Sequence, residues 1–427
     1  MGTSTAFVIH PEVRTIPLPR SADAMLAEAV QLVGAIGLDV VHAESVAFYK
    51  PRANTFLGSG HVDRIAELAE EADHPLIVVN AGLSPVQQRN LETGTCCKVI
   101  DRTALILEIF GARAQTHAGR LQVELAAMTF QRSRLVRSWT HLERQRGGGG
   151  FLGGPGERQI ELDRRMLMDR VVRIKRELKD VERTRHLQRG NRSRGEVPTV
   201  ALIGYTNAGK STLFNRLTGA GVLSKDMLFA TLDPTMRAVT LPSGRRIVLA
   251  DTVGFISQLP TELVEAFKST LEEVVQADLL LHVHDAASPL VAEEAEDVRA
   301  VLVDLGIDEE QQDERLLSVM NKSDLLEDQD PAREALGNLF DEGCFTSALD
   351  GDGIDTLLAA IDRRLGKDRR TENLVLGPAD GAARAWLHEH GEVIASRMGE
   401  AGDEMLEVAM DAADWARFGA RWPALAG

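Results

Sequence analysis

The sequence of 427 residues contains no long hydrophobic run. Its longest apolar stretches, such as residues 76–79 (LIVV) and 279–284 (LLLHVH), are far shorter than the roughly 20 residues that cross a membrane. The first residues, MGTSTAFVIHPEVRT, lack a basic segment followed by an apolar one, so no secretory signal is visible. These absences predict a soluble cytoplasmic protein without a membrane span.

Cysteine is also scarce, because Cys96, Cys97 and Cys344 are the complete set. Three cysteines cannot build a disulfide framework, and the adjacent pair lacks the spacing of metal ligands. A cysteine without a redox or metal role packs as a small apolar side chain. We therefore expect three buried free thiols.

The net charge of −16 by itself argues against a nucleic-acid partner. The charge is unevenly distributed, however. Residues 111–195 contain 20 Lys/Arg and 9 Asp/Glu, a balance of +11, whereas the rest of the chain contains 28 and 55, a balance of −27. This layout predicts contact with a polyanion through one basic module, while the acidic remainder limits indiscriminate binding. No DNA partner is expected.

Composition and periodicity divide the chain into four regions. Residues 1–110 alternate strand-like and helix-like runs, which predicts a small α/β domain. The expected strands are residues 39–50, 75–80 and 97–100, and the expected helices are residues 21–37 and 61–72.

Residues 111–195 predict an antiparallel helical hairpin. Apolar residues recur with heptad-like spacing on both sides of a glycine-rich stretch, RQRGGGGFLGGPGER (residues 144–158). The two apolar seams are Leu121, Leu125, Met128, Leu135, Trp139 and Leu142, and Ile160, Leu167, Val171, Ile174, Leu178 and Val181. The glycines would form the tip, whose backbone can approach RNA closely. A flexible interdomain hinge is the alternative for this stretch.

After a polar linker that ends at Pro198, residues 199–366 alternate strands and helices. This alternation predicts a mostly parallel sheet with helices on both faces. The expected strands are residues 199–204, 245–252, 278–285 and 315–321, and the expected helices are 262–276, from about 289, and 354–365. Residues 371–427 predict a small C-terminal α/β domain, with strands at 373–377 and 404–411 and a helix over 381–398.

The strongest local signal is GYTNAGKS (Gly204–Ser211), which matches G-x-x-x-x-G-K-[ST] between a predicted strand and a predicted helix. Such a loop binds phosphate through backbone N–H groups at a helix N-terminus. Lys210 adds a positive charge, and the Ser211 hydroxyl coordinates Mg²⁺. Gly204 and Gly209 permit close backbone approach. The motif therefore predicts a nucleotide site.

Two weaker motifs follow in the order expected after a phosphate loop. DTVG (Asp251–Gly254) ends a predicted strand and places a carboxylate beside the phosphates, where it can hold the Mg²⁺ shell. NKSD (Asn321–Asp324) ends another strand, and its aspartate can accept two hydrogen bonds from guanine that adenine cannot offer. The first two residues of NKSD would brace the base and the phosphate loop, and TSAL (Thr346–Leu349) could supply an N–H to the guanine oxygen. In isolation, NKSD could be a turn and helix cap.

With these motifs in place, the chain resembles the HflX family of ribosome-associated GTPases, in the group of translation-factor-related GTPases that also holds Era and Obg. Beyond the GTP motifs, residues 228–235 (LFATLDPT) resemble the family's first switch, and residues 251–256 (DTVGFI) resemble its second switch. The likeness also rests on residues 99–110 (VIDRTALILEIF), 116–126 (THAGRLQVELA), 139–145 (WTHLERQ) and 153–165 (GGPGERQIELDRR). It extends from about residue 45 to residue 366. Arg158 and Ile160 stand where the family more commonly has Thr and Leu, and the GGGGFLGG run is more glycine-rich than usual.

The resemblance implies an Mg²⁺-dependent GTPase that hydrolyses GTP to GDP and phosphate. Its catalytic residues would be Lys210, Ser211, Thr231, Asp251 and Gly254, and its Mg²⁺ ligands would be Ser211, Thr231 and Asp251. Thr231 would also contact the γ-phosphate and order the first switch only while triphosphate is bound. The implied nucleotide-binding residues are Gly204, Tyr205, Thr206, Asn207, Ala208, Gly209, Lys210, Ser211, Thr212, Phe229, Ala230, Thr231, Leu232, Asp233, Asp251, Thr252, Val253, Gly254, Asn321, Lys322, Ser323, Asp324, Thr346, Ser347 and Ala348.

Phe255 occupies the position at which many small GTPases carry a glutamine that orients the attacking water. An apolar side chain cannot do so, and we infer slow intrinsic turnover. Phe255 either packs beneath the second switch or takes an active part in gating water. The residue pattern leaves both interpretations open.

The resemblance further implies that the protein binds the large ribosomal subunit and uses GTP to split, rescue or recycle stalled or idle ribosomes. The hairpin tip would probe rRNA through Arg144, Arg146, Arg158 and their neighbours. GTP and GDP are the expected ligands, and the free protein is expected to be a monomer.

Two alternatives remain open. The first is a nucleotide-dependent regulator or scaffold whose hairpin binds another RNA or a protein. The second is an additional ATP-dependent RNA-remodelling activity in the N-terminal domain. Residues 1–105 contain no second phosphate-loop pattern, and residues 49–63, with Gly58 and Gly60, are at best a weak candidate for such a site. They also fit an ordinary helix-entry turn.

Overall fold

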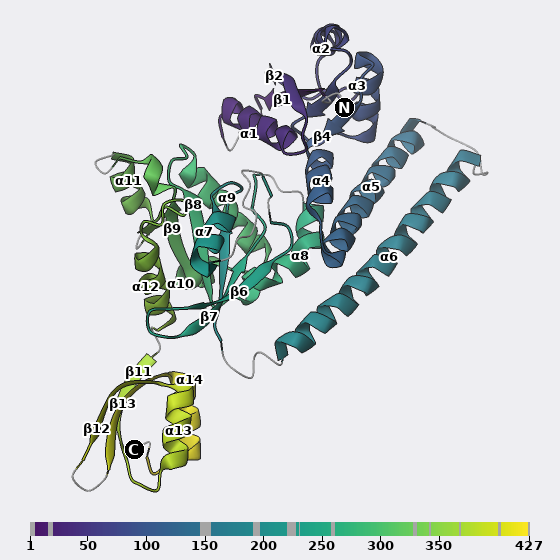
Figure 1. Cartoon of the computed structure of the whole chain (residues 1–427). Coiled ribbons are helices and arrows are strands. Elements are labelled where there is room, and N and C mark those ends of the chain that lie inside the picture. Colours follow the sequence, from purple (N-terminus) through teal and green to yellow (C-terminus); the bar gives the residue numbers. More distant parts are fainter. Residues whose placement is uncertain are drawn as a thin grey trace. The chain divides into compact units, whose positions relative to one another are not determined.

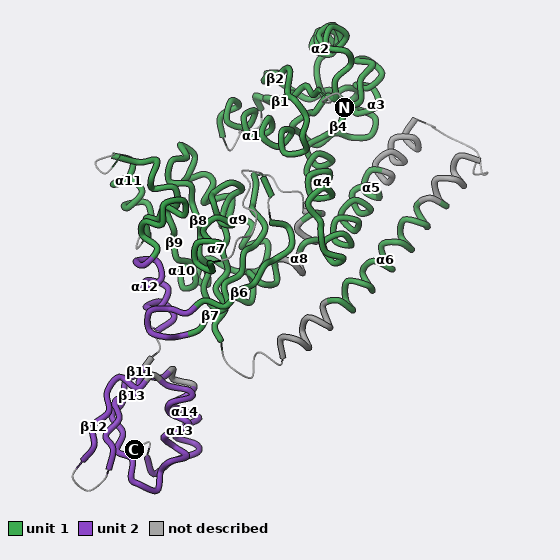
Figure 2. Tube along the Cα trace, in the orientation of Figure 1, with its two compact units in different colours: residues 1–239, 246–354 green, residues 240–245, 355–427 purple. Residues whose placement is uncertain are grey.

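The structure, a computed structural model, describes residues 5–15, 20–145, 155–190, 197–219, 228–229, 231–257, 261–327, 331–340, 343–366, 369–399 and 403–425. The chain forms two compact units (Figure 2). The first comprises residues 1–239 and 246–354, and the second comprises residues 240–245 and 355–427. A four-stranded and a six-stranded sheet lie in the first unit, and a three-stranded sheet lies in the second.

The N-terminal domain is a parallel four-stranded sheet of order β2-β1-β3-β4. Its strands are β1 (Thr5–Val13), β2 (Asp39–Phe48), β3 (Leu76–Val79) and β4 (Val99–Asp101), and its helices are α1 (Ala22–Gly34), α2 (Ser59–Glu71), α3 (Pro85–Thr95) and α4 (Arg102–Arg113). The predicted small α/β domain is confirmed. Gly58 is the N-cap residue of α2, as expected for a helix-entry turn.

Strand β1 lies inside this sheet, yet it was absent from the predicted strands. Its sequence contains Pro11, and proline within a run argues against a strand because it donates no backbone hydrogen bond. The pairing explains why Pro11 is tolerated. Strand β3 pairs only with Ala6–Ile9 of β1, so Pro11 lies where β1 has a neighbour on one side.

Helices α5 (His117–Gln145) and α6 (Pro155–Gly190) form the predicted antiparallel hairpin (Figure 1). Glu124 early in α5 accepts hydrogen bonds of 2.7 and 2.8 Å from Arg170 of α6. Seam residues Leu121, Leu125, Val171, Ile174 and Leu178 are buried. Residues 146–154, with the glycine tip and Arg146, lie outside the described residues, as do the side chains of Arg144 and Arg158.

The central domain contains a six-stranded sheet of order β10-β9-β8-β5-β7-β6, in which the pairs from β10 to β7 are parallel. Helices α7, α8 and α9 contact its strand β5. The elements are β5 (Thr199–Gly204), α7 (Lys210–Thr218), β6 (Thr235–Thr240), β7 (Arg246–Asp251), α8 (Thr261–Gln276), β8 (Leu279–Asp285), α9 (Val291–Asp304), α10 (Glu309–Arg315), β9 (Leu316–Asn321), the 3-10 helix η2 (Ser323–Leu325), α11 (Pro331–Leu339) and β10 (Cys344–Phe345). The next helix, α12 (Ile354–Leu365), belongs to the second compact unit from Asp355 on. The predicted, mostly parallel α/β sheet is confirmed.

One continuous apolar core joins the N-terminal domain, the hairpin and the central domain. Phe110, near the end of α4, is 2% exposed. Its ring centroid lies 4.7 Å from that of Phe229 and 4.8 Å from that of Phe267 on α8, both in edge-to-face arrangement. Edge-to-face pairs add favourable electrostatics to the burial of the rings. The region expected to be the first switch is thus packed against the helix that leads into the hairpin.

The C-terminal unit carries an antiparallel sheet of order β11-β13-β12. Its elements are β11 (Arg369–Leu376), α13 (Gly381–His390), β12 (Glu392–Met398), β13 (Glu404–Asp411) and α14 (Ala412–Arg421). The predicted helix over residues 381–398 was wrong beyond His390. Gly391 is extended and ends α13, and the β-branched Val393 and Ile394 then continue in a strand that pairs with β13.

The expectation of three buried thiols was wrong for one residue. Cys97 and Cys344 are buried and free, but Cys96 is exposed. Cys96 is the C-cap of α3 with a left-handed φ of 54°, and the chain turns there from the helix toward β4. Of the helices in the described ranges, none is long and apolar enough to cross a membrane.

The hairpin seam yields a stability prediction. Ile174 is fully buried on α6, whereas Val172 on the same helix is 49% exposed. We expect Ile174→Ala to lower the free energy of unfolding by about 2–5 kcal/mol, because it removes buried methyl groups and leaves a cavity. The matched variant Val172→Ala should change it by less than about 0.5 kcal/mol. Urea denaturation followed by circular dichroism measures both, and equal losses would contradict the assigned seam.

Candidate functional site

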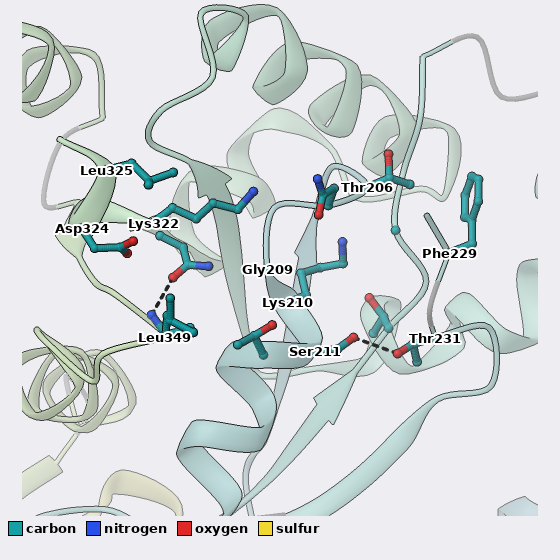
Figure 3. Close-up of a pocket in the computed structure, with 16 residues that line it drawn as sticks. Thr206, Gly209, Lys210, Ser211, Phe229, Thr231, Lys322, Asp324, Leu325 and Leu349 are labelled. Carbon is teal, nitrogen blue, oxygen red and sulfur yellow. Dashed lines mark hydrogen bonds between the residues drawn. The ribbon is translucent and has the colours of Figure 1, made fainter. Parts of the chain in front are cut away.

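A cavity of about 330 Å³ lies at the carboxyl ends of strands β5, β7 and β9. Open parallel α/β sheets bind ligands at this edge. The cavity is lined by Thr206, Asn207, Gly209, Lys210, Ser211, Thr212, Phe229, Thr231, Thr252, Gly254, Asn321, Lys322, Asp324, Leu325, Ala348 and Leu349. Figure 3 shows Lys210, Ser211 and Thr231 at one end and Lys322, Asp324 and Leu325 at the other.

Close packing and backbone conformation both require glycine at two positions of the predicted phosphate loop. Gly204 has a φ of +146°, and a Cβ there would lie 2.2 Å from the carbonyl oxygen of Val283. Gly209 has a φ of +88°, and a Cβ there would lie 2.2 Å from Asn321 Nδ2. A larger residue at either position would both strain the backbone and collide with its neighbour. The loop therefore keeps its shape only with glycine.

Lys210 begins helix α7 and points back into the loop. Its Nζ donates to the carbonyl oxygens of Gly204 (3.0 Å) and Tyr205 (2.7 Å). Burial lowers the pKa of Lys210 to about 8, and the charge of Asp251 opposes that shift. An ammonium held in this way without a directly bound anion is suited to a phosphate ligand, which would offset its desolvation.

Ser211, Thr231 and Asp251 converge on one point of the cavity. Ser211 Oγ lies 2.9 Å from Thr231 Oγ1, and both hydroxyls donate to Asp251 Oδ2, at 2.8 and 2.7 Å. Asp251 Oδ1 is buried without a hydrogen-bond partner. Burial raises the pKa of Asp251, opposed by hydrogen bonds from the two hydroxyls and by Lys210.

These three oxygen-bearing side chains fit a magnesium ion, which prefers hard oxygen ligands and usually keeps few protein ligands. The unpartnered carboxylate oxygen supplies the charge that such an ion needs. In the described part of the chain, no three His, Cys, Asp or Glu side chains gather in a way that could hold a metal alone. Phosphate oxygens and water would therefore have to complete the coordination shell.

Asn321 ties three loops together and is only 1% exposed. Its Nδ2 donates to the carbonyl oxygen of Ala208 (2.9 Å), and its Oδ1 accepts from the N–H of Ala348 (3.0 Å). Thr346 N–H in turn donates to the carbonyl oxygen of Met320 (2.8 Å). One buried amide thus sets the spacing between the phosphate loop and residues 346–348.

The opposite end of the cavity is suited to a planar base. Lys322 forms an ion pair with Asp285 at 2.6 Å, which fixes its position on the cavity wall. Asp324 follows on η2, and the apolar Leu325 and Leu349 flank the same end. Lys322 adopts a left-handed φ of 62°, which turns the chain sharply after β9. Leu325 was absent from the predicted site, and Leu349 appeared only as the last residue of the TSAL motif, because an apolar side chain carries no polar signal.

Most of the predicted nucleotide-binding residues either line the cavity or support it from behind. Those that do not line it include Gly204, Ala208, Leu232, Asp251, Val253, Ser323, Thr346 and Ser347. Of these, Asp251 contacts the lining side chains of Ser211 and Thr231, and Ala208 and Thr346 contribute backbone hydrogen bonds around Asn321. Ala230 lies outside the described residues.

Tyr205 and Asp233 have other contacts than the predicted ones. The Tyr205 hydroxyl donates to Glu28 of α1 and accepts from Arg20 (3.0 Å), both in the N-terminal domain. The Asp233 carboxylate accepts from the backbone N–H of Thr116 (3.0 Å) and from its hydroxyl, directly before α5. Neither residue lines the cavity. The motifs alone could not reveal these contacts, because the partners lie more than a hundred residues away.

Phe255 packs as a structural residue. Its side chain is 2% exposed, and its backbone pairs with the phosphate loop. Its N–H donates to the carbonyl oxygen of Gly204 (3.1 Å), and its carbonyl oxygen accepts from Thr206 N–H (2.7 Å). The first of the two interpretations of Phe255, packing beneath the second switch, agrees with this burial. No water-orienting side chain stands at this position.

The chain matches three family models along most of its length. Residues 23–111 match the GTP-binding GTPase N-terminal region, residues 113–192 match the GTP-binding GTPase middle region, and residues 199–322 match a model described as 50S ribosome-binding GTPase. The chain is 51% identical to GTPase HflX of Magnetococcus marinus, over 88% of this chain and 86% of that protein. It is 45% identical to GTPase HflX of Escherichia coli, over 94% and 93% respectively.

The chain belongs to the HflX family of GTPases. The order of domains in this HflX protein follows the three matched regions. Most of the residues that line the described cavity lie in the third, and Asp324, Leu325, Ala348 and Leu349 follow it. Its reaction is the hydrolysis of GTP to GDP and phosphate. Positioning and electrostatics supply most of the catalysis in this class of reaction.

The bridging amide of Asn321 yields a binding prediction for this HflX GTPase. Replacing Asn321 with alanine removes two buried hydrogen bonds, each contributing about 1 kcal/mol. We expect Asn321→Ala to weaken GDP binding roughly 30-fold, the equivalent of about 2 kcal/mol. Asn338→Ala, an exposed asparagine on α11, is the matched control and should bind as the parent does. Calorimetric titration measures both, and unchanged binding by Asn321→Ala would refute the bridging role.

Proposed function

We propose that this HflX GTPase binds the large ribosomal subunit and uses GTP binding and hydrolysis to split, rescue or recycle stalled or idle ribosomes. The observation that carries the proposal is the direct contact between the first switch and the basic hairpin, through Asp233 and Thr116. The description of the model matched by residues 199–322 as a 50S ribosome-binding GTPase supports the same partner. Such a partner places the protein in the cytoplasm.

The contact joins the nucleotide to the start of the hairpin. Thr116 Oγ1 accepts from Gly119 N–H (3.0 Å), which caps the first turn of α5, while its hydroxyl donates to Asp233. Asp233 lies two residues after Thr231, whose hydroxyl reaches the proposed magnesium position. A negative side chain at a helix N-terminus is also favourable because of the helix dipole. Release of Thr231 after hydrolysis would therefore disturb the cap of α5.

Close packing keeps this contact tight. A Cβ at Gly119 would lie 2.6 Å from Asp233 Oδ1, so α5 approaches the first switch with no room for a side chain. Phe110 adds an apolar contact to the same switch through Phe229. Both contacts lie near the start of α5, whereas the end of α5 at Gln145 and the start of α6 at Pro155 lie at the opposite end of the hairpin.

The hairpin has the charge that rRNA binding needs. Arg164, Arg165, Arg173 and Arg176 on α6 are exposed, in a region with a balance of +11. Lysine and arginine bind nucleic acid chiefly by neutralising phosphates. We propose that Arg144, Arg146 and Arg158 near the tip contact rRNA as well.

We propose that GTP lies with its phosphates against Lys210 and Ser211 and its guanine against Asp324. A bound Mg²⁺ would supply charge stabilisation to the β- and γ-phosphates, held by Ser211, Thr231 and Asp251. Asp324 would accept hydrogen bonds from the guanine N1–H and its exocyclic amine. Gly254 lies close to Lys210, so its backbone N–H can face the γ-phosphate.

The base assignment predicts a change of specificity. Asp324→Asn should weaken GTP binding at least about 100-fold, because the carboxylate that accepts two guanine hydrogen bonds is lost. The same variant should bind xanthosine triphosphate more tightly than the parent, since an amide N–H can donate to the xanthine oxygen. Competition against a fluorescent GDP analogue measures both affinities. Equal weakening for the two bases would contradict the assignment.

The partner assignment predicts a charge effect on ribosome binding. The assay is pelleting with purified large subunits in the presence of a non-hydrolysable GTP analogue. In this assay the double variant Arg164→Glu, Arg165→Glu should bind the subunits at least about 10-fold more weakly, and its binding should depend less on salt concentration. GDP affinity should stay unchanged. Lys50→Glu with Arg89→Glu, two exposed positions of the N-terminal domain, changes the charge equally and is the control.

Equal effects of the two pairs would point to nonspecific charge. Nucleotide binding without any pelleting by the parent protein would favour the regulator or scaffold.

A further inference from the structure

The N-terminal domain contacts the nucleotide-binding loops through a buried polar cluster, the Glu28 cluster, made of Arg20, Glu28, Arg102, Tyr205, Ser257 and Asp297. Glu28 of α1 lies between two guanidinium groups, because Arg20 is 3.3 Å away and Arg102 also pairs with it. The side chains of Arg20 and Arg102 are 3% and 5% exposed. Charges buried to this extent persist only when they are paired.

Ser257 directly follows the DTVGFI motif. Its N–H, carbonyl and hydroxyl groups each form a hydrogen bond to a residue of the cluster. Its N–H donates to the Tyr205 hydroxyl (2.8 Å), and its carbonyl oxygen accepts from Arg102 (2.8 Å). Its hydroxyl donates to Glu28, with both carboxylate oxygens at 3.0 Å. Two of these three partners belong to the N-terminal domain. The residue that directly follows the second switch is therefore held by two residues of the N-terminal domain, Glu28 and Arg102, as well as by Tyr205.

The position of the cluster in the N-terminal sheet is informative. The strand order is β2-β1-β3-β4, so β2 is added on one side of β1 and β3 on the other. The strand order therefore reverses between β1 and β3. Asn80 and Arg102 directly follow β3 and β4, and Arg102 donates to Asn80 Oδ1 (2.8 Å). Doubly wound sheets bind their ligands outside the carboxyl ends of the strands at such a reversal. Here Tyr205 and Ser257 of the GTPase domain reach this edge.

We propose that Glu28, Arg102 and Tyr205 are positioning residues for GTP hydrolysis, which hold Ser257 and thereby set the second switch for the reaction. The chain from Asp251 to Ser257 is fixed at both ends, at Asp251 by Ser211 and Thr231 and at Ser257 by the Glu28 cluster. Gly254 lies between these ends, and a Cβ there would lie 3.2 Å from Lys210 Nζ. A small shift at Ser257 therefore moves backbone beside the lysine. The proposal rests on GTP hydrolysis alone and not on ribosome binding.

The test is a double-mutant cycle on purified full-length protein without ribosomes. Glu28→Gln and Ser257→Ala should each lower kcat for GTP hydrolysis about 10-fold, since misplacement of a reacting geometry by about 1 Å costs up to 10²-fold. KM and GDP affinity should stay within about twofold, because the cavity walls are unchanged. The double variant should be no slower than the slower single variant, because both changes break one connection. Asp23→Asn, an exposed acid on the same helix, is the control.

Glu28→Gln leaves two buried arginines with one fewer anion and could unfold the protein. Ser257→Ala changes no charge and keeps the test valid in that case. Ser257→Thr retains the hydroxyl and should recover most of the kcat that Ser257→Ala loses. Additive effects in the cycle, an unchanged kcat in folded Ser257→Ala, or a loss confined to KM would overturn the proposal. A failure to bind ribosomes would leave all of these results unchanged.

Discussion

The packing of Phe110 against Phe229 and Phe267 joins three parts of this protein. These rings come from the end of the N-terminal domain, the first switch and helix α8, and they belong to one continuous apolar core. Apolar burial is the largest favourable term in folding, and a shared core transmits displacement because protein interiors are close-packed. A displacement of Phe229, in the region expected to be the first switch, would therefore also affect Phe110 at the end of α4.

Hydrogen bonds between specific residues accompany this apolar packing. Asp233 binds the start of α5, and Ser257 binds the Glu28 cluster, so each switch has its own hydrogen-bonded partner in the N-terminal part of the chain. The hydrogen bonds around Glu28 specify geometry strongly, because breaking one leaves a charge beside buried guanidinium groups uncompensated, whereas those between Thr116 and Asp233 are exposed. The two switches are thus tied to different elements, one to the hairpin and one to the N-terminal sheet.

The nucleotide cavity itself is built with little freedom. Gly204 and Gly209 leave no space for a Cβ, and Asn321 holds three loops in register through two hydrogen bonds. Lys210 and Asp251 are both buried, and burial lowers the pKa of Lys210 and raises the pKa of Asp251. Burial therefore favours the neutral form of each group. Groups arranged in this way before the ligand binds are preorganised, so little reorganisation is needed during the reaction.

The sequence determined the local features of this HflX GTPase. Heptad spacing predicted the hairpin, and the GYTNAGKS, DTVG and NKSD motifs predicted a shared site, because each motif ends a parallel strand at the same sheet edge. Lys210 and Asp324 line one cavity, and Asp251 contacts its lining residues Ser211 and Thr231. Local spacing could not find β1, whose strand character depends on pairing on both sides of Ala6–Ile9. It also missed the strand after His390, where the helical pattern was carried past Gly391.

Only the tertiary structure decided what Tyr205, Asp233, Leu325 and Leu349 contact. Tyr205 and Asp233 sit inside or beside GTP motifs, yet their side chains turn to Glu28 and Thr116, residues 177 and 117 positions away in the chain. Leu325 and Leu349 carry no polar signature and reach the cavity because η2 and the loop after β10 bring them there. A sequence motif predicts the roles of residues that are close together in the chain. Contacts between distant segments depend on how the folded core positions those segments.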